Sequence, residues 1–401
     1  MIKYWIWLQK VMGFASGRTD EILAKYENPK QLYEDRKNAD KTLKSLTKRD
    51  FSRLCSVPLS VANVVIDDCD RCGVRIITPD MDEYPKSLFD IYGTPLVFYA
   101  IGDVSLLKTP IAATIVGTRE PTKYATRAAY KLSYDLAKAG VTIISGSAMG
   151  IDSWAHGGAL DAGGKTIAVA GTGLDVDYPK PNHDLRARIA REGLVISEFP
   201  PRTKPDKNNF PYRNRIMSAL SCGTIVAQAP HGSGSLITAR IAIEQGKDVY
   251  IVPDSIFCET SAGGLELLKE CGYPITSATD FIKNYISEYS EYLVISEIPT
   301  KMKYTPSKEV QQLEEDTKVE EKVAEKQVPL EPLNTDIPDD IDEVTLGVYN
   351  LLKSDKLTPD VIARNLNIPI GLVLTTLSDL EMDNFIRSIG NNKYTAQQDL
   401  K

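Results

Sequence analysis

Histidine and cysteine are scarce in this sequence. Its 401 residues include three histidines, at 156, 183 and 231, and six cysteines scattered between positions 55 and 271. Only Cys69 and Cys72 form a CxxC pair, and neither a second pair nor a nearby histidine completes a tetrahedral zinc set. The wide spacing of the thiols also disfavours a disulfide framework. We therefore expect reduced cysteines, a structural role for Cys69 and Cys72, and neither a metal nor a cofactor.

Long apolar runs are missing as well. No stretch of about 18 uncharged apolar residues occurs, so the sequence offers no membrane span. The first ten residues include Lys3 and Lys10 and lack an apolar region followed by a small-residue cleavage site, so no secretory signal is expected. These absences predict a cytoplasmic protein.

The charge of the chain is unevenly distributed. The formal net charge of −7 at first disfavours a polyanionic partner. However, residues 297–342 alone hold six lysines against 13 acidic residues, which equals the whole excess. Residues 110–256 contain 17 Lys or Arg and 13 Asp or Glu. The middle of the chain is therefore suited to an anionic ligand.

Composition and periodicity divide the chain into five segments. Short amphipathic helices predict a small helical domain of the SAM or helix-hairpin-helix type over residues 1–75, and an extended connector follows over 76–107. A larger domain fills residues 108–290. Residues 297–340 are rich in Glu, Lys, Pro and Gln, which predicts an acidic flexible linker. Three helical patterns and a final hairpin predict a winged helix over 341–398.

Short apolar runs alternate with helical stretches in the larger domain. The runs contain few polar residues, as is typical of strands that are buried on both faces of a parallel sheet. Six strands are predicted, at 112–116, 141–144, 166–170, 194–197, 224–227 and 249–252. The fold class is therefore α/β, with a Rossmann-like doubly wound parallel sheet.

Glycine and hydroxyl residues follow several of these strands. Gly117-Thr118-Arg119 comes after the first, Ser145-Gly146 starts the turn after the second, and Ser233-Gly234-Ser235 opens a helix that also carries Thr238. Ligands of doubly wound sheets bind at the carboxyl ends of the strands, where such turns expose backbone N–H groups. The pattern predicts an anion site, although a single turn of this kind is more often only a tight connection.

A basic and aromatic segment, KNNFPYRNR, spans Lys207 to Arg215. It places three cations and two aromatic residues within nine positions, and Pro211 is expected to keep its start extended. Cations for phosphates and aromatic faces for bases are what single-strand binding requires. On the segment alone, a solvated loop with buried aromatic residues is an equal alternative.

The motifs occur in an order that resembles the DprA (DNA-processing protein A, Smf) family. They are GTR at 117–119, SGSAMGID at 145–152, AH at 155–156, GKT at 164–166, YP at 178–179, SE at 197–198, FPYRNR at 210–215 and SGSLITA at 233–239. The resemblance covers roughly residues 110–255. It implies a protein that is not an enzyme, binds and protects incoming single-stranded DNA during natural transformation and homologous recombination, and helps to load the RecA recombinase.

The resemblance also implies roles for single residues. Arg119, Lys207 and Phe210 match the main DNA contacts of the family, with the cations at phosphates and the ring stacked on a base. The complete predicted interface is Gly117, Thr118, Arg119, Ser145, Gly146, Lys207, Phe210, Arg213, Asn214, Arg215, Ser233, Gly234, Ser235 and Thr238. Arg213 and Arg215 are expected at phosphates too, but an internal hydrogen-bonding role for one of them stays open.

Three single positions and one run depart from the family pattern; the run is Gly263-Gly264-Leu265-Glu266, where Gly-Thr-Asn is usual. Met149 stands where a basic residue is usual, Gln228 where Glu is usual, and Asp254 where a Val-Pro-Gly ending is usual. The loss of a cation at position 149 is expected to weaken DNA binding.

Two other classes of function stay open. A nucleotide-binding or nucleotide-hydrolysing Rossmann-like enzyme would use Asp152, His156 or Glu198 as acid or base, although no nucleophile with an adjacent base is evident. A pure interaction scaffold would leave the central pocket without a ligand. The oligomeric state is also open, with a homodimer as one candidate.

The last predicted helix bears on the role of the winged helix. It and the residues after it carry Asp379, Glu381 and Asp383, with no cation before Arg387. An acidic helix suits a duplex groove poorly, so a protein-interaction or regulatory role is preferred.

Overall fold

The computed structural model describes residues 1–294, 296, 333–334, 341–389 and 392–397. The acidic linker predicted at 297–340 therefore lies almost wholly outside the described residues. In the described part no single helix is long and apolar enough to cross a membrane, and the one pair that would pass together, α16 (Pro359–Leu366) with α17 (Ile370–Met382), is bent by 115°. All six cysteines are free thiols.

Six helices form the N-terminal domain: α1 (Ile2–Met12), α2 (Arg18–Lys25), α3 (Pro29–Asp35), α4 (Ala39–Thr42), α5 (Lys48–Ser56) and α6 (Val61–Cys72). Local sequence sets their ends. Thr47 and Asp50 make a capping box at the start of α5, and Gly73, with φ 64°, ends α6 in the left-handed conformation. Trp7 and its apolar neighbours bury this domain against Tyr99 of the main sheet.

One sheet of nine strands forms the centre of the molecule. Its strands are β1 (Arg75–Ile77), β2 (Phe98–Gly102), β3 (Ala112–Gly117), β4 (Thr142–Gly146), β5 (Thr166–Ala170), β6 (Leu194–Ser197), β7 (Gly223–Gln228), β8 (Asp248–Ile251) and β9 (Tyr273–Pro274). The order is β1-β2-β6-β5-β4-β3-β7-β8-β9. The six predicted strands are confirmed as β3 to β8. The predicted connector adds β1 and β2, which pair antiparallel at the edge next to β6.

The order of the strands reverses at β3. The chain runs outward from β3 through β4 and β5 to β6, and then returns to place β7 on the other side of β3. The β3–β7 register shifts between Val116 and Gly117, at the carboxyl end of the strand. β3 and β7 therefore flank a topological switch point, where doubly wound folds bind their ligands.

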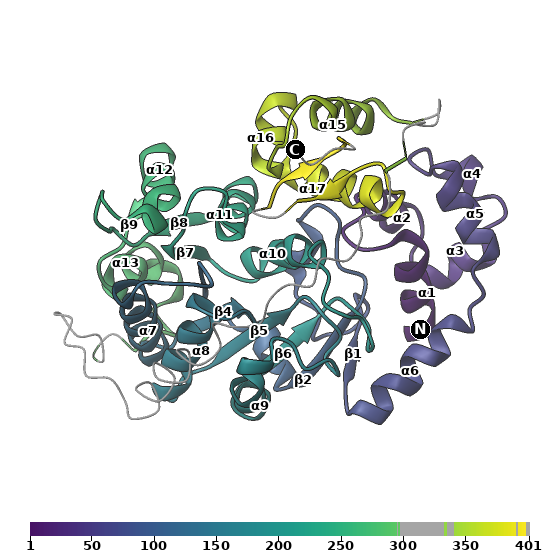
Figure 1. Cartoon of the computed structure of the whole chain (residues 1–401). Helices are drawn as coiled ribbons and strands as arrows, with labels where there is room; N and C mark the ends of the chain where they lie inside the picture. The colour runs from purple at the N-terminus through teal and green to yellow at the C-terminus, as the bar shows by residue number, and fades with distance from the viewer. Residues whose placement is uncertain (295, 297–332, 335–340, 390–391, 398–401) are drawn as a thin grey trace.

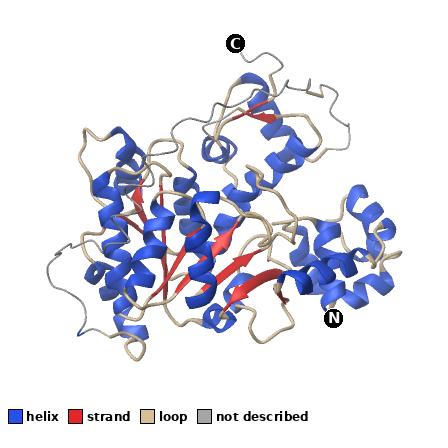
Figure 2. Ribbon diagram, turned by 60° about the horizontal axis from the view of Figure 1, so that its bottom comes forward, coloured by secondary structure: helices blue, strands red, loops and turns tan. Residues whose placement is uncertain are grey.

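Helices cover both faces of the sheet, as Figures 1 and 2 show. α7 (Lys123–Lys138), α8 (Ile151–Asp161) and α13 (Ala278–Tyr289) pack on one face, and α9 (His183–Glu192) contacts α8 beside them. α10 (Asn209–Ala219), α11 (Gly234–Glu244) and α12 (Ala262–Glu270) pack on the other. Short 3-10 turns lie at Lys86–Phe89, Val104–Lys108, Lys180–Asn182 and Glu259–Ser261.

The start of α10 differs from the prediction. The segment before Arg213 was expected to be extended because it precedes or contains Pro211, but the helix already begins at Asn209. Pro211 lies in the first turn, where a backbone N–H would have no partner within the helix, so proline costs little there. The basic segment is therefore mostly helical, and its side chains point in different directions around α10.

The C-terminal module comprises α15 (Glu343–Ser354), α16 (Pro359–Leu366), α17 (Ile370–Met382), β10 (Arg387–Ser388) and β11 (Tyr394–Thr395). These are the three helices and hairpin that the sequence predicts, while the winged-helix assignment itself stays a prediction. The module has a core of its own, built around Val348, Ile362 and Leu377. Figure 1 shows it beside α10, α11 and α2, and α17 contacts both α10 and α11.

Candidate nucleic-acid interface

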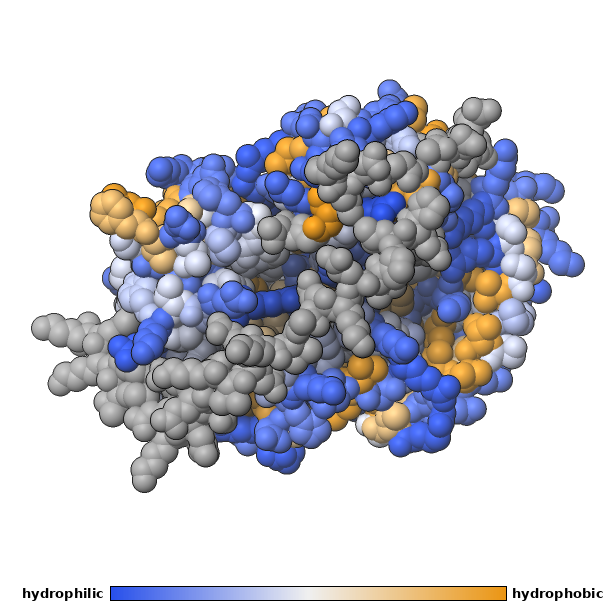
Figure 3. Space-filling model, viewed as in Figure 1, coloured by the Kyte–Doolittle hydropathy of each residue, from blue (hydrophilic) through white to orange (hydrophobic). Residues whose placement is uncertain are grey.

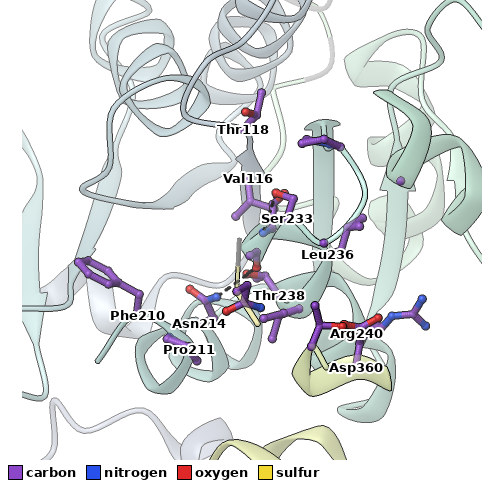
Figure 4. A pocket seen from close by; sticks show the side chains of 18 of the residues that line it. Val116, Thr118, Phe210, Pro211, Asn214, Ser233, Leu236, Thr238, Arg240 and Asp360 are labelled. Atoms are coloured by element: carbon purple, nitrogen blue, oxygen red, sulfur yellow. Dashed lines mark hydrogen bonds between the residues drawn. The ribbon is translucent and has the colours of Figure 1, made fainter. Parts of the chain in front are cut away.

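A cavity of about 990 Å³ opens at the carboxyl ends of β3 and β7. Its walls come from the turn after β3, the start of α10, the segment from β7 into α11, and the C-terminal module. Figure 4 shows side chains from each of these parts around it, among them Thr118, Phe210, Ser233 and Asp360. The cavity therefore lies at the switch point of the sheet, the expected ligand site of this fold.

The turn after β3 presents Arg119 at the mouth of the cavity. The Thr118 N–H donates to the Gln228 carbonyl at 2.8 Å, which ties the turn to β7. A Cβ atom on Gly117 would lie 2.5 Å from Cγ1 of Ile151, so only glycine fits there. The Arg119 side chain is exposed, and its guanidinium carbon lies 5.4 Å from the centre of the Phe210 ring. This distance is typical of a cation–π contact.

The Phe210 ring is itself held in place. It lies over Gly171, where a Cβ atom would come within 2.9 Å of ring atom Cδ1, and the Tyr178 ring centre is 5.9 Å away. Phe210 is half-buried and lines the cavity together with the exposed Lys207. The cavity wall therefore combines an aromatic ring with the cations Arg119 and Lys207, as single-strand binding requires.

Arg213 lies deeper, against the end of β4. Its guanidinium packs on Gly146 next to the Asp152 carboxylate, and its Nε is buried without a hydrogen-bond partner. Burial lowers the pKa of Arg213 to about 10, an effect that Asp152 opposes and Arg119 reinforces, so the group stays cationic at neutral pH. Burial also raises the pKa of Asp152, although Arg213 opposes this. Arg213 and Asp152 therefore lie together in the buried part of the site, and both interact electrostatically with Arg119.

Arg215, two residues further along α10, faces the opposite way. Its Nη2 lies 2.8 Å from Oε1 of Glu198, and both side chains are buried. Neither residue lines the cavity. The structure therefore places Arg215 in an internal ion pair, the alternative that the sequence left open for one of the two arginines.

Most of the other predicted residues come together. Gly117, Thr118, Arg119, Lys207, Phe210, Arg213, Asn214, Ser233, Gly234, Ser235 and Thr238 line the cavity, whereas Ser145, Gly146 and Arg215 do not. The Ser145 hydroxyl is buried and donates to the Ile115 carbonyl at 2.6 Å. Gly146 contributes indirectly, because its lack of a side chain leaves room for the guanidinium of Arg213, which lines the cavity.

The N-terminus of α11 forms another wall of the cavity. Ser233 is its N-cap, and its hydroxyl accepts from the Ser235 N–H at 3.3 Å. Asn214 connects this turn to α10, with its amide 3.4 Å from the Gly234 carbonyl. Backbone donors and hydroxyls at a helix N-terminus favour an anion.

The charges around the cavity favour an anionic ligand. Six cations line it, namely Arg119, Lys207, Arg213, Arg240, Arg364 and Lys393, against the four acids Glu120, Asp152, Glu266 and Asp360. The face of the molecule in Figure 3 is mostly hydrophilic, with apolar side chains in small groups. A polar, charged ligand therefore suits this site better than an apolar one.

Several lining residues were not predicted. Arg240 and Tyr178 come from the central domain, and the module adds Thr358, Asp360, Val361, Arg364, Ser388, Asn392, Lys393 and Tyr394. Two signals were available: Arg240 directly follows the SGSLITA motif on the same helix, and Tyr178 belongs to the YP motif. Nothing in the sequence places the module over the cavity, because that depends on how two distant segments dock.

The acid and base candidates of an enzyme do not assemble here. His156 and Glu198 are buried away from the cavity, and of the three candidates only Asp152 lines it, next to Arg213. His156 Nε2 lies 2.8 Å from the Gly146 carbonyl, and Nδ1 lies 2.7 Å from the Thr166 hydroxyl. Burial lowers the pKa of His156 to about 4. Among the described residues no group of three or more His, Cys, Asp or Glu side chains could hold a metal.

Fold and cavity together define a class: a Rossmann-like α/β protein with a cationic cleft at the switch point of its sheet. Residues 75–286 match the family model described as DNA recombination-mediator protein A. The Bacillus subtilis DNA processing protein DprA is 40% identical over 220 residues, which span 55% of this chain and 74% of the relative. The Streptococcus pneumoniae protein of the same name is 44% identical over 204 residues, 51% of this chain and 72% of the relative.

A solved structure agrees with these matches. The X-ray structure of DNA processing protein A from Streptococcus pneumoniae superposes with a TM-score of 0.62 at 34% identity and covers 72% of this chain and 98% of that one. The chain therefore belongs to the DNA recombination-mediator protein A family, DprA/Smf.

Two departures from the family pattern contact each other. Gln228 Nε2 donates to Oδ2 of Asp254 at 3.1 Å and to the Ser261 hydroxyl at 3.0 Å. A glutamate at position 228 would place two carboxylates together, so Gln228 suits Asp254. The third departure, Met149, is 39% exposed and lines a small cavity of about 70 Å³ beside Arg119 and Phe210.

Proposed function

We propose that this protein binds single-stranded DNA in the cavity at the switch point and acts in DNA processing during transformation and recombination. The observation that carries the proposal is the stack of Arg119 over Phe210, 5.4 Å apart, at the mouth of a cation-lined cleft. A strand would place phosphates at Arg119 and Lys207 and a base on the ring of Phe210. Membership of the family and the names of its relatives support the same reading.

The test is binding of a fluorescent poly-dT oligonucleotide, against a duplex of equal length, at two salt concentrations. Wild-type protein should prefer the single strand. Arg119→Ala and Lys207→Ala should each bind more weakly and lower the slope of log K against log salt by about 0.7, the value for one phosphate contact on a single strand. Arg191→Ala, an exposed residue of α9 away from the cavity, is the matched control. Equal binding by all four proteins would refute the proposal.

We propose further that binding occurs without catalysis. The supporting observation is that, of the three candidates Asp152, His156 and Glu198, only Asp152 lines the cavity, where it packs against Arg213. Release of phosphate from ATP or GTP, abolished by Asp152→Asn, would instead favour the nucleotide-hydrolysing alternative.

Transfer of the bound strand to RecA and assembly as a homodimer are proposals that rest on the family resemblance. The first predicts that the protein accelerates RecA ATP hydrolysis on poly-dT, and that Arg119→Ala removes the acceleration. The second is tested by the mass of the full chain in sedimentation.

A further inference from the structure

The last helix of the C-terminal module has two apolar faces. Val373, Leu377 and Leu380 pack into the core of the module. Ile370 and Leu374 face the other way and form a buried cluster with Ile237 and Ile241 of α11. In addition, the Ile370 N–H donates to Oε1 of Glu244 at 3.0 Å. In this arrangement α17 is packed on the central domain and is not free to enter a duplex groove.

The docking of α17 brings the hairpin β10–β11 to the edge of the cleft. The buried Tyr394 of β11 donates its hydroxyl to Oδ1 of Asn208 at 3.5 Å. Asn208 follows Lys207, and Tyr394 follows Lys393, so the two lysines come from adjacent positions on either side of this contact. Both lysines are exposed, and both line the cavity.

Lys393 is the module's available cation. Its ammonium makes no hydrogen bond or ion pair to any residue that the structure describes. Arg364 of α16 also lines the cavity, but it shares Glu270 with Arg240, at 3.8 and 3.2 Å, so its charge is partly offset. An exposed, unpaired cation on the wall of a cleft is well placed for a phosphate.

We propose that the hairpin β10–β11 is a second wall of the single-strand cleft and that Lys393 contacts the phosphate backbone of the same strand that Arg119 and Lys207 hold. This inference rests on the proposed function and extends it to the C-terminal module. The module thereby takes part in single-strand binding through its hairpin rather than through α17. Ser388 and Asn392, which also line the cavity, add hydrogen-bonding groups to this wall.

The expected effect follows from counterion release. One phosphate contact on a single strand contributes about 0.7 to the slope of log K against log salt, which corresponds to about a fivefold change in affinity at roughly 0.1 M salt. Lys393→Ala should therefore bind poly-dT about five times more weakly than wild type and with a smaller slope. Lys353→Ala, an exposed lysine on α15 that does not line the cavity, removes the same charge from the same module and should bind as wild type does.

A second variant tests whether the hairpin contacts the bound strand or the module blocks access to the cleft. Leu374 belongs to the cluster between α17 and α11 and not to the core of the module, so Leu374→Gln should loosen the docking without unfolding the module or changing its charge. If the hairpin is a wall, this variant binds poly-dT more weakly. If it binds more tightly, the module covers the site and the inference is wrong.

The outcomes also separate this inference from the proposed function. If Arg119→Ala weakens binding while Lys393→Ala does not, the cleft binds DNA but the hairpin is not part of it. If wild-type protein does not bind poly-dT, both proposals are refuted.

Discussion

Gly146 leaves space for the buried Arg213 guanidinium and Asp152 carboxylate. Its substitution therefore tests whether the position of Arg213 contributes to stability and to DNA binding. A Cβ atom at this position would overlap the Arg213 guanidinium and the Asp152 carboxylate. Gly146→Ala must therefore push the guanidinium away and leave Asp152 buried without its partner. Arg213 and Asp152 interact through their charges without a direct salt bridge, so the about 3 to 5 kcal/mol that is lost when a buried ion pair is broken is an upper bound here. Because burial already raises the pKa of Asp152, protonation of the carboxyl should limit the cost to about 3 kcal/mol.

The assay is thermal unfolding of the full chain followed by circular dichroism. For a domain of 150 to 250 residues, a loss of about 3 kcal/mol lowers the midpoint by roughly 6 to 12 °C. The deficit should shrink as the pH falls from 7 towards 5, because a carboxyl whose pKa is raised in the folded state gains stability on protonation. DNA binding should weaken as well, since Arg213 lines the cavity.

Gly157→Ala is the matched control. Gly157 lies inside α8, and a Cβ atom there would meet nothing within 4 Å. Alanine is a better helix former than glycine, so this variant should be unchanged or more stable by about 0.5 to 1 kcal/mol. If Gly146→Ala melts with wild type, or if both variants lose the same stability, the buried Arg213–Asp152 contact does not have the role described.

Three further predictions concern single side chains. Arg215→Ala leaves the buried Glu198 unpaired, so the free energy of unfolding in urea should fall by about 3 to 5 kcal/mol; a value near wild type would contradict the internal ion pair. His156 has its pKa lowered from 6.5 to about 4, so wild-type stability is complete above pH 6.5 and is lost by up to roughly 3 kcal/mol as the pH falls to 4. His156→Gln should unfold with a flatter pH profile, and an identical profile would exclude this residue as the cause. Phe210→Ala should weaken poly-dT binding by about 1 to 3 kcal/mol with an unchanged salt slope, unlike Lys207→Ala; a changed slope would argue against stacking.

The sheet could be predicted because each strand carries its own signal. In runs such as Thr166–Ala170 every residue after the first is apolar, and glycine ends the strand or follows it, as in Ala112–Gly117. A buried parallel strand needs little else to be recognised. The carboxyl-end residues then follow from the topology alone, which is why Gly117, Thr118 and Arg119 were placed correctly at the cavity.

The directions of the side chains in the basic segment could not be predicted from the sequence. Arg213 and Arg215 look equivalent in the sequence, and both were expected at phosphates. Two positions apart on a helix, however, they point in nearly opposite directions, one towards Asp152 and the other towards Glu198. The sequence left an internal role open for one of the two arginines but could not assign it to Arg215, because the direction of each side chain depends on how α10 packs on the sheet.

Acidic residues at the end of α17 interact with the N-terminal domain, which the sequence did not predict. Asp379 and Asp383 argued against insertion into a duplex, and they instead face the N-terminal domain. Arg49 Nη1 lies 3.1 Å from Oδ2 of Asp383, and burial raises the pKa of Asp379 while Arg18 and Arg49 oppose that shift. The two apolar faces of α17 pack against the module and against α11, and its acidic end contacts the N-terminal domain. Of the two exposed cations that the described part of the module places at the cleft, Arg364 of α16 is paired with Glu270 and Lys393 of the hairpin is not, and this is why we assign single-strand contact to the hairpin and not to α17.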